Sequence, residues 1–134
     1  EAKKRLFSWL YNPDSNDRLL EKFYDRNALV NQFWDGKHVS TPYGRNIEVD
    51  KRRALNYLIQ STTADRVLEK AVLIDKMLEG KKSFISHIVH DEIVIDYSDE
   101  DRNMVFGIRD VFEDGYLANL RAGKDYYNLN ELKL

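Results

Sequence analysis

Three polar residues, His90, Asp91 and Glu92, stand in the middle of an apolar run that extends from Phe84 to Tyr97. Burying an unpaired carboxylate costs several kcal/mol or forces it to take up a proton, so two adjacent acids here need a reason. The apolar residues on both sides predict paired strands, with the polar residues at or near the turn. A tight hairpin would raise Asp91 to the rim of the sheet, where a magnesium ion could bind it. The alternative is an ordinary charged turn, since acids are common in turns.

A second candidate set lies on a predicted helix. Arg52, Asn56 and Gln60 are spaced by four residues, so each step advances by about 40° and all three share one face. An arginine followed by two amides forms a row of hydrogen-bond donors with fixed geometry, which suits phosphates, sugars or base edges. The alternative is a solvated helix face with a basic start.

A third set, Lys3, Phe7 and Tyr11, has the same spacing of four and shares one helix face. A cation, an aromatic ring and a phenol in line could hold a phosphate, stack on a base and contact a sugar. The alternative is an amphipathic helix whose aromatic stripe belongs to the core.

Two helices are expected in the first part of the chain. Residues 1–11 favour a helix, which the Asn-Pro-Asp sequence after it breaks. A second helix is expected from about Asp17 to Trp34, capped by Ser15 or Asn16 and ended by Gly36. The apolar side of this second helix comprises Leu19, Leu20, Phe23, Val30 and Phe33.

A long helix is expected from about Lys51 to Glu79, capped by Asp50 and ended by Gly80. The second half of this helix is almost wholly apolar on one side, which predicts the central buried helix of the fold. The residues of that side are Val67, Leu68, Ala71, Val72, Ile74 and Leu78.

Patterns typical of strands predict two hairpins, and one further helix follows them. The expected ranges are 38–41 paired with 46–49, 84–89 paired with 93–97, a helix at 101–116 and an edge strand near 117–121. These elements predict an α+β fold, with a long buried helix and flanking helices packed on a small antiparallel sheet.

Composition narrows the class of protein. The chain has 134 residues, of which 43% are hydrophobic and 33% charged, so a packed core is feasible. No cysteine is present, which excludes disulfides and thiolate zinc sites, and the net charge of −2 gives no basic signature for nucleic acid. No run approaches the roughly 18 apolar residues of a membrane helix, so we expect a soluble intracellular protein that does not bind a membrane. The first residue is Glu1, without a helix cap before it, so we expect a piece of a longer protein.

The three sets, in this order, resemble the C-terminal part of family A DNA polymerases, the DNA polymerase I type, including phage replicative enzymes. NYLIQSTTAD is similar to the family segment N-x-x-x-Q-G/S-x-x-A-D, and IVHDEIVI is similar to the palm motif that carries the catalytic aspartate. HVSTPYGRNIEV resembles a hairpin with a T-x-x-G-R sequence, and RAGKDYYNL resembles the closing segment near the C-terminus. The resemblance covers nearly the whole chain.

The resemblance implies a domain layout and an activity. Residues 1–35 would hold the end of the fingers helix and the helix after it, and residues 36–134 the palm subdomain with the HDE hairpin. The activity would be template-directed nucleotidyl transfer by two magnesium ions in DNA replication or repair. Asp91 would bind both ions, Glu92 would be the adjacent, secondary catalytic acid, and His90 would lie close to the primer terminus.

The resemblance also assigns the two helix sets. Lys3 would contact the phosphates of the incoming deoxynucleoside triphosphate, Phe7 would pack on its base or sugar, and Tyr11 would lie beside the templating position. The row of Arg52, Asn56 and Gln60 would read minor-groove acceptors and backbone near the primer end. The implied partners are primer–template DNA, deoxynucleoside triphosphates and the remainder of the polymerase chain, in the cytoplasm of a bacterium or phage-infected cell, or in an organelle.

The sequence departs from the family pattern before Lys3. A second palm aspartate, in an Asp-Tyr/Phe-Ser-x-x-Glu motif upstream of the fingers, has no counterpart in these 134 residues. DYSDED, at Asp96–Asp101, follows HDE and is therefore in the wrong order, so we interpret it as a strand end leading to a helix cap. Because one of the two metal-binding aspartates is missing, we expect the isolated chain to be inactive and to bind magnesium weakly at best.

Three other functions remain open from the sequence. A polymerase-derived DNA-binding or structural module without catalysis would keep the Arg52–Gln60 row and would not need Asp91. An HD-type metal phosphohydrolase would use His90 and Asp91, but it would need further histidines and an aspartate on helices. A helical interaction domain would carry the three sets by chance.

Overall fold

The computed structural model describes residues 1–132, and it divides into two compact units, Glu1–Asp65 and a second that begins at Arg66. Both units combine helices with small antiparallel sheets, which confirms the α+β class. The strands form three separate two-stranded sheets and not one small sheet. The expected boundary near residue 35 falls within the first unit and stays a prediction. No helix of residues 1–132 is long and apolar enough to cross a membrane.

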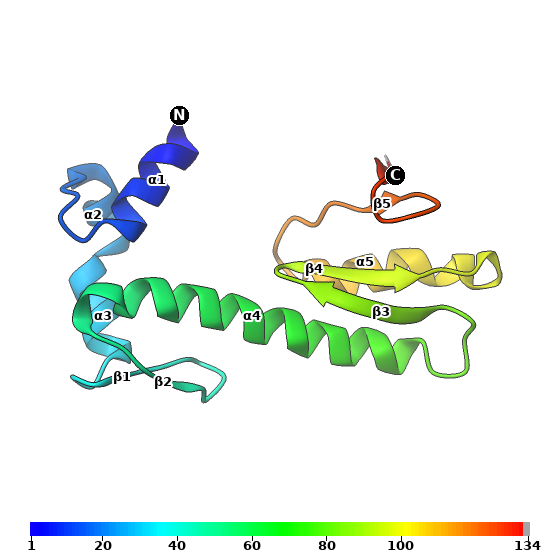
Figure 1. Ribbon diagram of the computed structural model, residues 1–134, viewed down its shortest axis with the longest axis horizontal. Coiled ribbons are helices and arrows are strands. Elements are labelled where there is room, and N and C mark those ends of the chain that lie inside the picture. Colours follow the sequence, from blue (N-terminus) through cyan, green and yellow to red (C-terminus); the bar gives the residue numbers. More distant parts are fainter. Residues whose placement is uncertain (133–134) are drawn as a thin grey trace. The chain divides into compact units, whose positions relative to one another are not determined.

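Unit 1 consists of three short helices, one hairpin and the beginning of a long helix (Figure 1). The hairpin forms where the sequence predicts it. The elements are α1 (Ala2–Tyr11), α2 (Arg18–Tyr24), α3 (Arg26–Phe33), β1 (His38–Ser40), β2 (Asn46–Glu48) and α4 (Lys51–Met77), of which unit 1 holds the part up to Asp65.

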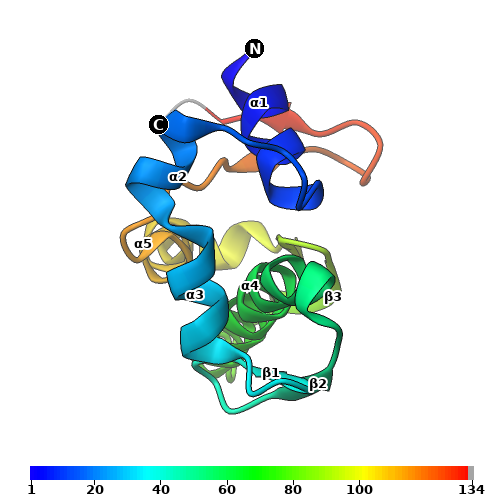
Figure 2. The same cartoon turned by 90° about the vertical axis from the view of Figure 1, so that its left-hand side faces the viewer.

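The single helix expected from Asp17 to Trp34 is wrong, because the chain breaks at Asp25 into α2 and α3 (Figure 2). Asp25 has a left-handed backbone (φ 37°), and its side chain accepts a hydrogen bond from the Ala28 N–H, so it ends α2 and caps α3. The cap of α2 is Asp17, and neither Ser15 nor Asn16 takes that role.

The break also changes which side chains are buried. Phe23 is 73% exposed and Leu19 is exposed as well, whereas Val30 on α3 is buried. A continuous helix would have aligned all three on one face, but α2 and α3 are separate helices, so the face that is buried can differ between them. Helix α3 ends at Phe33, before Gly36.

The core of unit 1 gathers residues from α1, α3, the β1–β2 hairpin and α4. Trp9 is its largest member, and its indole N–H donates to Glu21 at 2.9 Å while the Arg26 guanidinium lies 4.7 Å from its ring centre. The buried residues of this core are Trp9, Val30, Val39, Val49, Ala54, Leu55 and Leu58. Trp9 therefore anchors α1, and the opposite face of that helix stays free.

Unit 2 takes the remainder of α4 and adds a hairpin, two consecutive helices and a short C-terminal hairpin (Figure 1). The elements are β3 (Phe84–Val89), β4 (Glu92–Asp96), the 3₁₀ helix η1 (Asp99–Met104), α5 (Val105–Glu113), β5 (Arg121–Ala122) and β6 (Asn130–Glu131). The edge strand expected near 117–121 is wrong, because β5 begins only at Arg121 and pairs with β6.

The buried side of α4 in unit 2 is narrower than the sequence predicts. The stripe comprises Val67, Ala71, Ile74 and Leu78, whereas Leu68 and Val72 are exposed. Lys70 is buried as well, and its ammonium group lies 2.5 Å from Asp114, directly after α5. A lysine can bury its alkyl stem and still bring its charge to the C-terminal end of a helix.

The bounds of the helix expected at 101–116 are wrong, because the chain forms the 3₁₀ helix η1, which ends at Met104, and then α5, which ends at Glu113. Asp101 lies inside η1. Its backbone departs from helical geometry (φ −101°, ψ 19°), and one carboxylate oxygen accepts the N–H groups of Lys82 and Ser83 at 2.9 and 2.7 Å. Asp101 thus fixes the loop that leads into β3. The expectation that DYSDED joins a strand end to a helix start is confirmed.

Asp101 should make the stability of unit 2 depend on pH. Hydrogen bonds, first from the Ser83 N–H, hold the pKa of Asp101 below its ordinary value of 3.8. A lowered folded-state pKa gives stability that is complete above pH 3.8 and is lost as the pH falls through the folded pKa. We expect Asp101→Asn to lower the free energy of unfolding at pH 7, and the difference from the parent to shrink at pH 3. Denaturant unfolding at both pH values measures this, with Asp99→Asn in the same turn as the control; a pH-independent difference would contradict it.

Candidate nucleic-acid interface

The HDE sequence forms the tip of a tight hairpin. Val89 pairs with Glu92 across the antiparallel β3–β4 ladder, which leaves His90 and Asp91 as the two-residue turn. His90 has a positive φ of 52°, a strained conformation for a residue with a Cβ, and such strain gathers at functional turns. Asp91 is exposed. The expected hairpin with Asp91 at its rim is therefore confirmed in geometry.

The hairpin is not the buried element that its apolar sequence indicates. Strand β3 has exposed residues at four of its six positions, including Phe84 and Ile88, and the residues of β4 are at most half-buried. Asp91 therefore stays in solvent without an energetic penalty, and no buried carboxylate needs explaining.

Glu92 differs from Asp91 because both of its carboxylate oxygens are engaged. Its Oε1 pairs with the Arg121 guanidinium at the start of β5, and its Oε2 accepts the Tyr126 hydroxyl at 3.2 Å. Sequence reasoning missed these contacts, since nothing in the local pattern relates the hairpin to the closing segment RAGKDYYNL.

The row on α4 lies in unit 1 and is open to solvent. The Gln60 amide donates to the Asn56 amide oxygen at 3.0 Å, so the two side chains are held in line. Arg52 pairs with Asp14 at 3.1 Å, and their side chains are 68% and 81% exposed. Such an exposed pair contributes little stability, so a phosphate group can compete for the guanidinium.

The set on α1 also lies in unit 1 and is outside the core. The Lys3 ammonium group is 5.5 Å from the centre of the Phe7 ring, and the Phe7 and Tyr11 rings are 5.7 Å apart. Both rings are exposed, because Trp9 is the residue of α1 that enters the core. The alternative in which this aromatic stripe is core is wrong.

A contact between two of the quoted motifs was not foreseen. In the T-x-x-G-R turn, Arg45 forms an ion pair with Asp65 at 2.5 Å, and the Thr41 hydroxyl donates to the same carboxylate at 3.3 Å. Asp65 closes the NYLIQSTTAD segment, so this contact joins the β1–β2 hairpin to α4. Gly44 has a φ of 83°, which suits glycine at this point of the turn.

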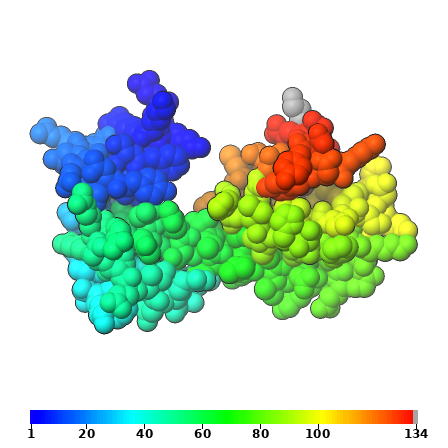
Figure 3. Space-filling model, viewed as in Figure 1, coloured from blue at the N-terminus to red at the C-terminus, as the bar shows by residue number. Residues whose placement is uncertain are grey.

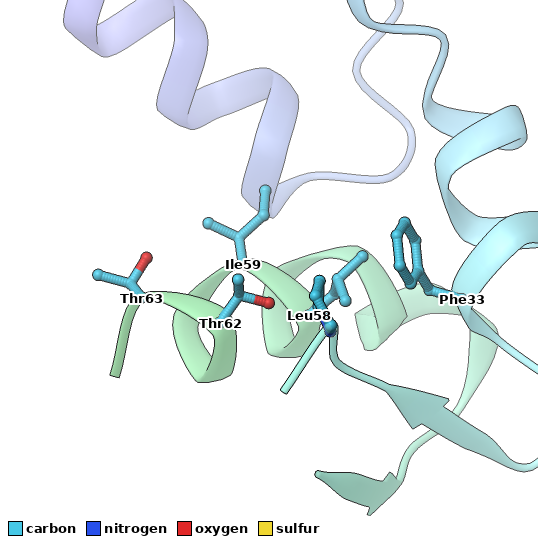
Figure 4. Close-up of a pocket in the computed structure, with 6 residues that line it drawn as sticks. Phe33, Leu58, Ile59, Thr62 and Thr63 are labelled. Atoms are coloured by element: carbon cyan, nitrogen blue, oxygen red, sulfur yellow. The ribbon is translucent and has the colours of Figure 1, made fainter. Parts of the chain in front are cut away.

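Two pockets accompany these sets in unit 1. One, of about 360 Å³, has an apolar floor that includes Leu10 and Leu55 and a rim with Arg26, Lys51 and Arg52. The other, of about 260 Å³, is almost wholly apolar (Figure 4). The residues that line the second pocket are Phe33, Pro42, Leu58, Ile59, Thr62 and Thr63. The first pocket thus places Arg26 and Lys51 beside Arg52, the first residue of the row on α4, and Asp14 lines it as well.

Magnesium prefers carboxylate oxygens as ligands, and Asp91 offers one exposed carboxylate. Within residues 1–132, no three acidic or histidine side chains lie close enough together to hold a metal ion.

No protein-family model matches the chain, and neither a curated protein nor a solved structure matches it significantly.

Proposed function

We propose that this chain is the C-terminal part of a DNA-directed DNA polymerase of family A, with the palm hairpin and the end of the fingers helix. The observation that carries the proposal is the order and exposure of the three polar sets. The residues of the three sets are exposed, except Asn56 and Glu92, which are half-buried. Two sets lie on helices and one on a hairpin, which are the element types that the resemblance implies.

The row on α4 supports a duplex-reading role by its chemistry. Arg52 offers a guanidinium for a phosphate, while Asn56 and Gln60 offer amides that can reach base or sugar acceptors. The minor groove presents similar acceptors for every base pair. Such a row therefore contacts a duplex without sequence preference, as a replicative enzyme requires.

The set on α1 supports a nucleotide-binding role. The Lys3 ammonium suits the phosphates of a nucleoside triphosphate, and the exposed ring of Phe7 can stack on a base. Tyr11 extends the same face with a second ring and a hydroxyl group.

Asp91 would supply one of the two carboxylates of the catalytic centre. When bound, magnesium would stabilise charge on the reacting oxygens. Asp91 holds an exposed carboxylate in the turn of the β3–β4 hairpin. Because the proposed centre needs a second such aspartate, we expect the 134-residue chain by itself not to extend a primer.

DNA binding by the chain tests this proposal. We expect fluorescence anisotropy to detect binding of labelled primer–template DNA with no dependence on base sequence. Replacing Asn56 and Gln60 together by alanine should weaken the affinity by about tenfold, since each lost hydrogen bond costs about 0.5–1.5 kcal/mol. Arg52→Ala should lower the slope of log affinity against log salt by about one.

Two exposed amides on α3 supply the matched control. Replacing Asn31 and Gln32 by alanine removes the same chemistry from another helix of unit 1 and should leave the affinity within twofold. The proposal is wrong if the chain does not bind duplex DNA at low salt, or if the two double variants behave alike.

A further inference from the structure

The C-terminal hairpin is attached to the β3–β4 hairpin through Glu92. This acid opens β4, directly after Asp91, and its two oxygens bind Arg121 and Tyr126. The Tyr126 ring also lies 5.8 Å from the His87 ring on β3. Figures 1 and 3 show the C-terminal segment, in orange and red, over the residues of β3 and β4.

The C-terminal hairpin has its own internal order but no buried core. Asp125 accepts the N–H groups of Tyr127 and Asn128 at 3.0 Å, and the Leu132 N–H donates to the Leu120 carbonyl at 2.8 Å. Every residue of β5 and β6 is exposed, and Tyr127 is 93% exposed. Within residues 120–132, only Leu120 and Leu129, which flank the two strands, are half-buried. Polar contacts must therefore contribute much of what fixes the position of this hairpin.

Glu92 is well suited to this task. An arginine and a phenol bind its two oxygens from one side, and charge-assisted hydrogen bonds of this kind are stronger than neutral ones. The hydrogen bond to Glu92 also raises the pKa of Tyr126 above the ordinary value of a tyrosine. Each oxygen keeps a second lone pair, but a cation at Glu92 would have to compete with the positive charge of Arg121.

We infer that Glu92 is a positioning residue that anchors the C-terminal hairpin and thereby leaves Asp91 as the one open carboxylate of the turn. Arg121 keeps Glu92 away from any cation at Asp91, and the anchor restrains the strand that follows Asp91. The consequence for catalysis rests on the proposed polymerase function. The anchor itself does not, because it involves neither DNA nor nucleotide.

Hydrogen exchange in the 134-residue chain tests the anchor. Glu92→Gln and Arg121→Met should each speed amide exchange in residues 117–132 by about threefold or more, since each removes the charged pair that holds the segment. The charge swap Glu92→Arg with Arg121→Glu should restore slow exchange. Glu131→Gln changes another acid of the same hairpin and is the control. The anchor is refuted if the two single variants exchange at the control rate.

Manganese binding tests whether Arg121 keeps Glu92 away from a cation at Asp91. Mn²⁺ serves as a hard-cation probe, and its paramagnetic broadening of NMR signals reports binding. Asp91→Asn should weaken Mn²⁺ binding by about tenfold, while Glu92→Gln should change it by less than twofold. Arg121→Met frees the Glu92 carboxylate beside Asp91, so affinity should rise by about fivefold. Adding Glu92→Gln to Arg121→Met should remove this gain.

These variants separate positioning from ligation. If Glu92 is itself a metal ligand, Glu92→Gln weakens Mn²⁺ binding as much as Asp91→Asn does, and Arg121→Met brings no gain. That result would overturn the inference. A failure of the chain to bind DNA would refute the polymerase proposal and leave both of these measurements interpretable.

Discussion

Replacing Asp91 by asparagine is expected to lower templated primer extension by roughly 10³-fold, in a polypeptide that joins this chain to the upstream palm and fingers segments of a family A DNA polymerase. The joined polypeptide supplies the second aspartate that these 134 residues lack. The substitution keeps the size and hydrogen bonding of the side chain but removes the negative charge that attracts the cation. The initial rate of primer extension, measured at saturating nucleotide and magnesium, checks this.

Asp96→Asn is the matched control for this experiment, because Asp96 is an exposed acid at the end of β4, the strand that follows Asp91. We expect it to retain activity within threefold. DNA affinity should not fall in either variant, since removing a negative charge cannot weaken attraction to phosphates. If Asp91→Asn extends primers within tenfold of the parent, Asp91 is not a catalytic ligand, and the alternative of a non-catalytic DNA-binding module gains support.

The hairpin that carries Asp91 was predictable because its signals are local. Two runs of β-branched residues separated by polar residues define strands and a turn without reference to the rest of the chain. The surroundings of Glu92 were not predictable in this way. Arg121 and Tyr126 approach it from the far end of the sequence, and no spacing rule relates them to a strand.

The break between α2 and α3 was not predictable for a different reason. Apolar periodicity indicates one helix from Asp17 to Trp34, and the break depends on one residue, Asp25, that leaves helical geometry and caps the next helix. Aspartate favours caps and turns, but it is also tolerated on a solvated helix face, so its type alone did not decide between the two. The tertiary burial of Val30 and Trp9 decides it.

The sequence predicts too wide a buried side for α4, because the second half of this helix contains more apolar residues than one face can bury. Leu68 follows Val67 and Val72 follows Ala71 in the sequence. The apolar pattern alone therefore fits a buried stripe that contains either member of each pair. The structure buries Val67, Ala71, Ile74 and Leu78, with spacings of four, three and four residues. Hydrophobicity places a helix against a core, but only the packing partners select the rotation about its axis.

The second large effect is expected for the stability of the fold, at Ile74 on the buried side of α4. Ile74 is 1% exposed, so Ile74→Ala should lower the free energy of unfolding by about 3 kcal/mol, from lost transfer energy and the cavity that remains. Val72→Ala, two residues away on the same helix, removes an apolar group that is 54% exposed and should cost less than about 0.5 kcal/mol. Urea unfolding followed by circular dichroism gives both values. If the two substitutions cost the same, the helix presents the wider face that the sequence alone indicates, and the buried stripe described here is incorrect.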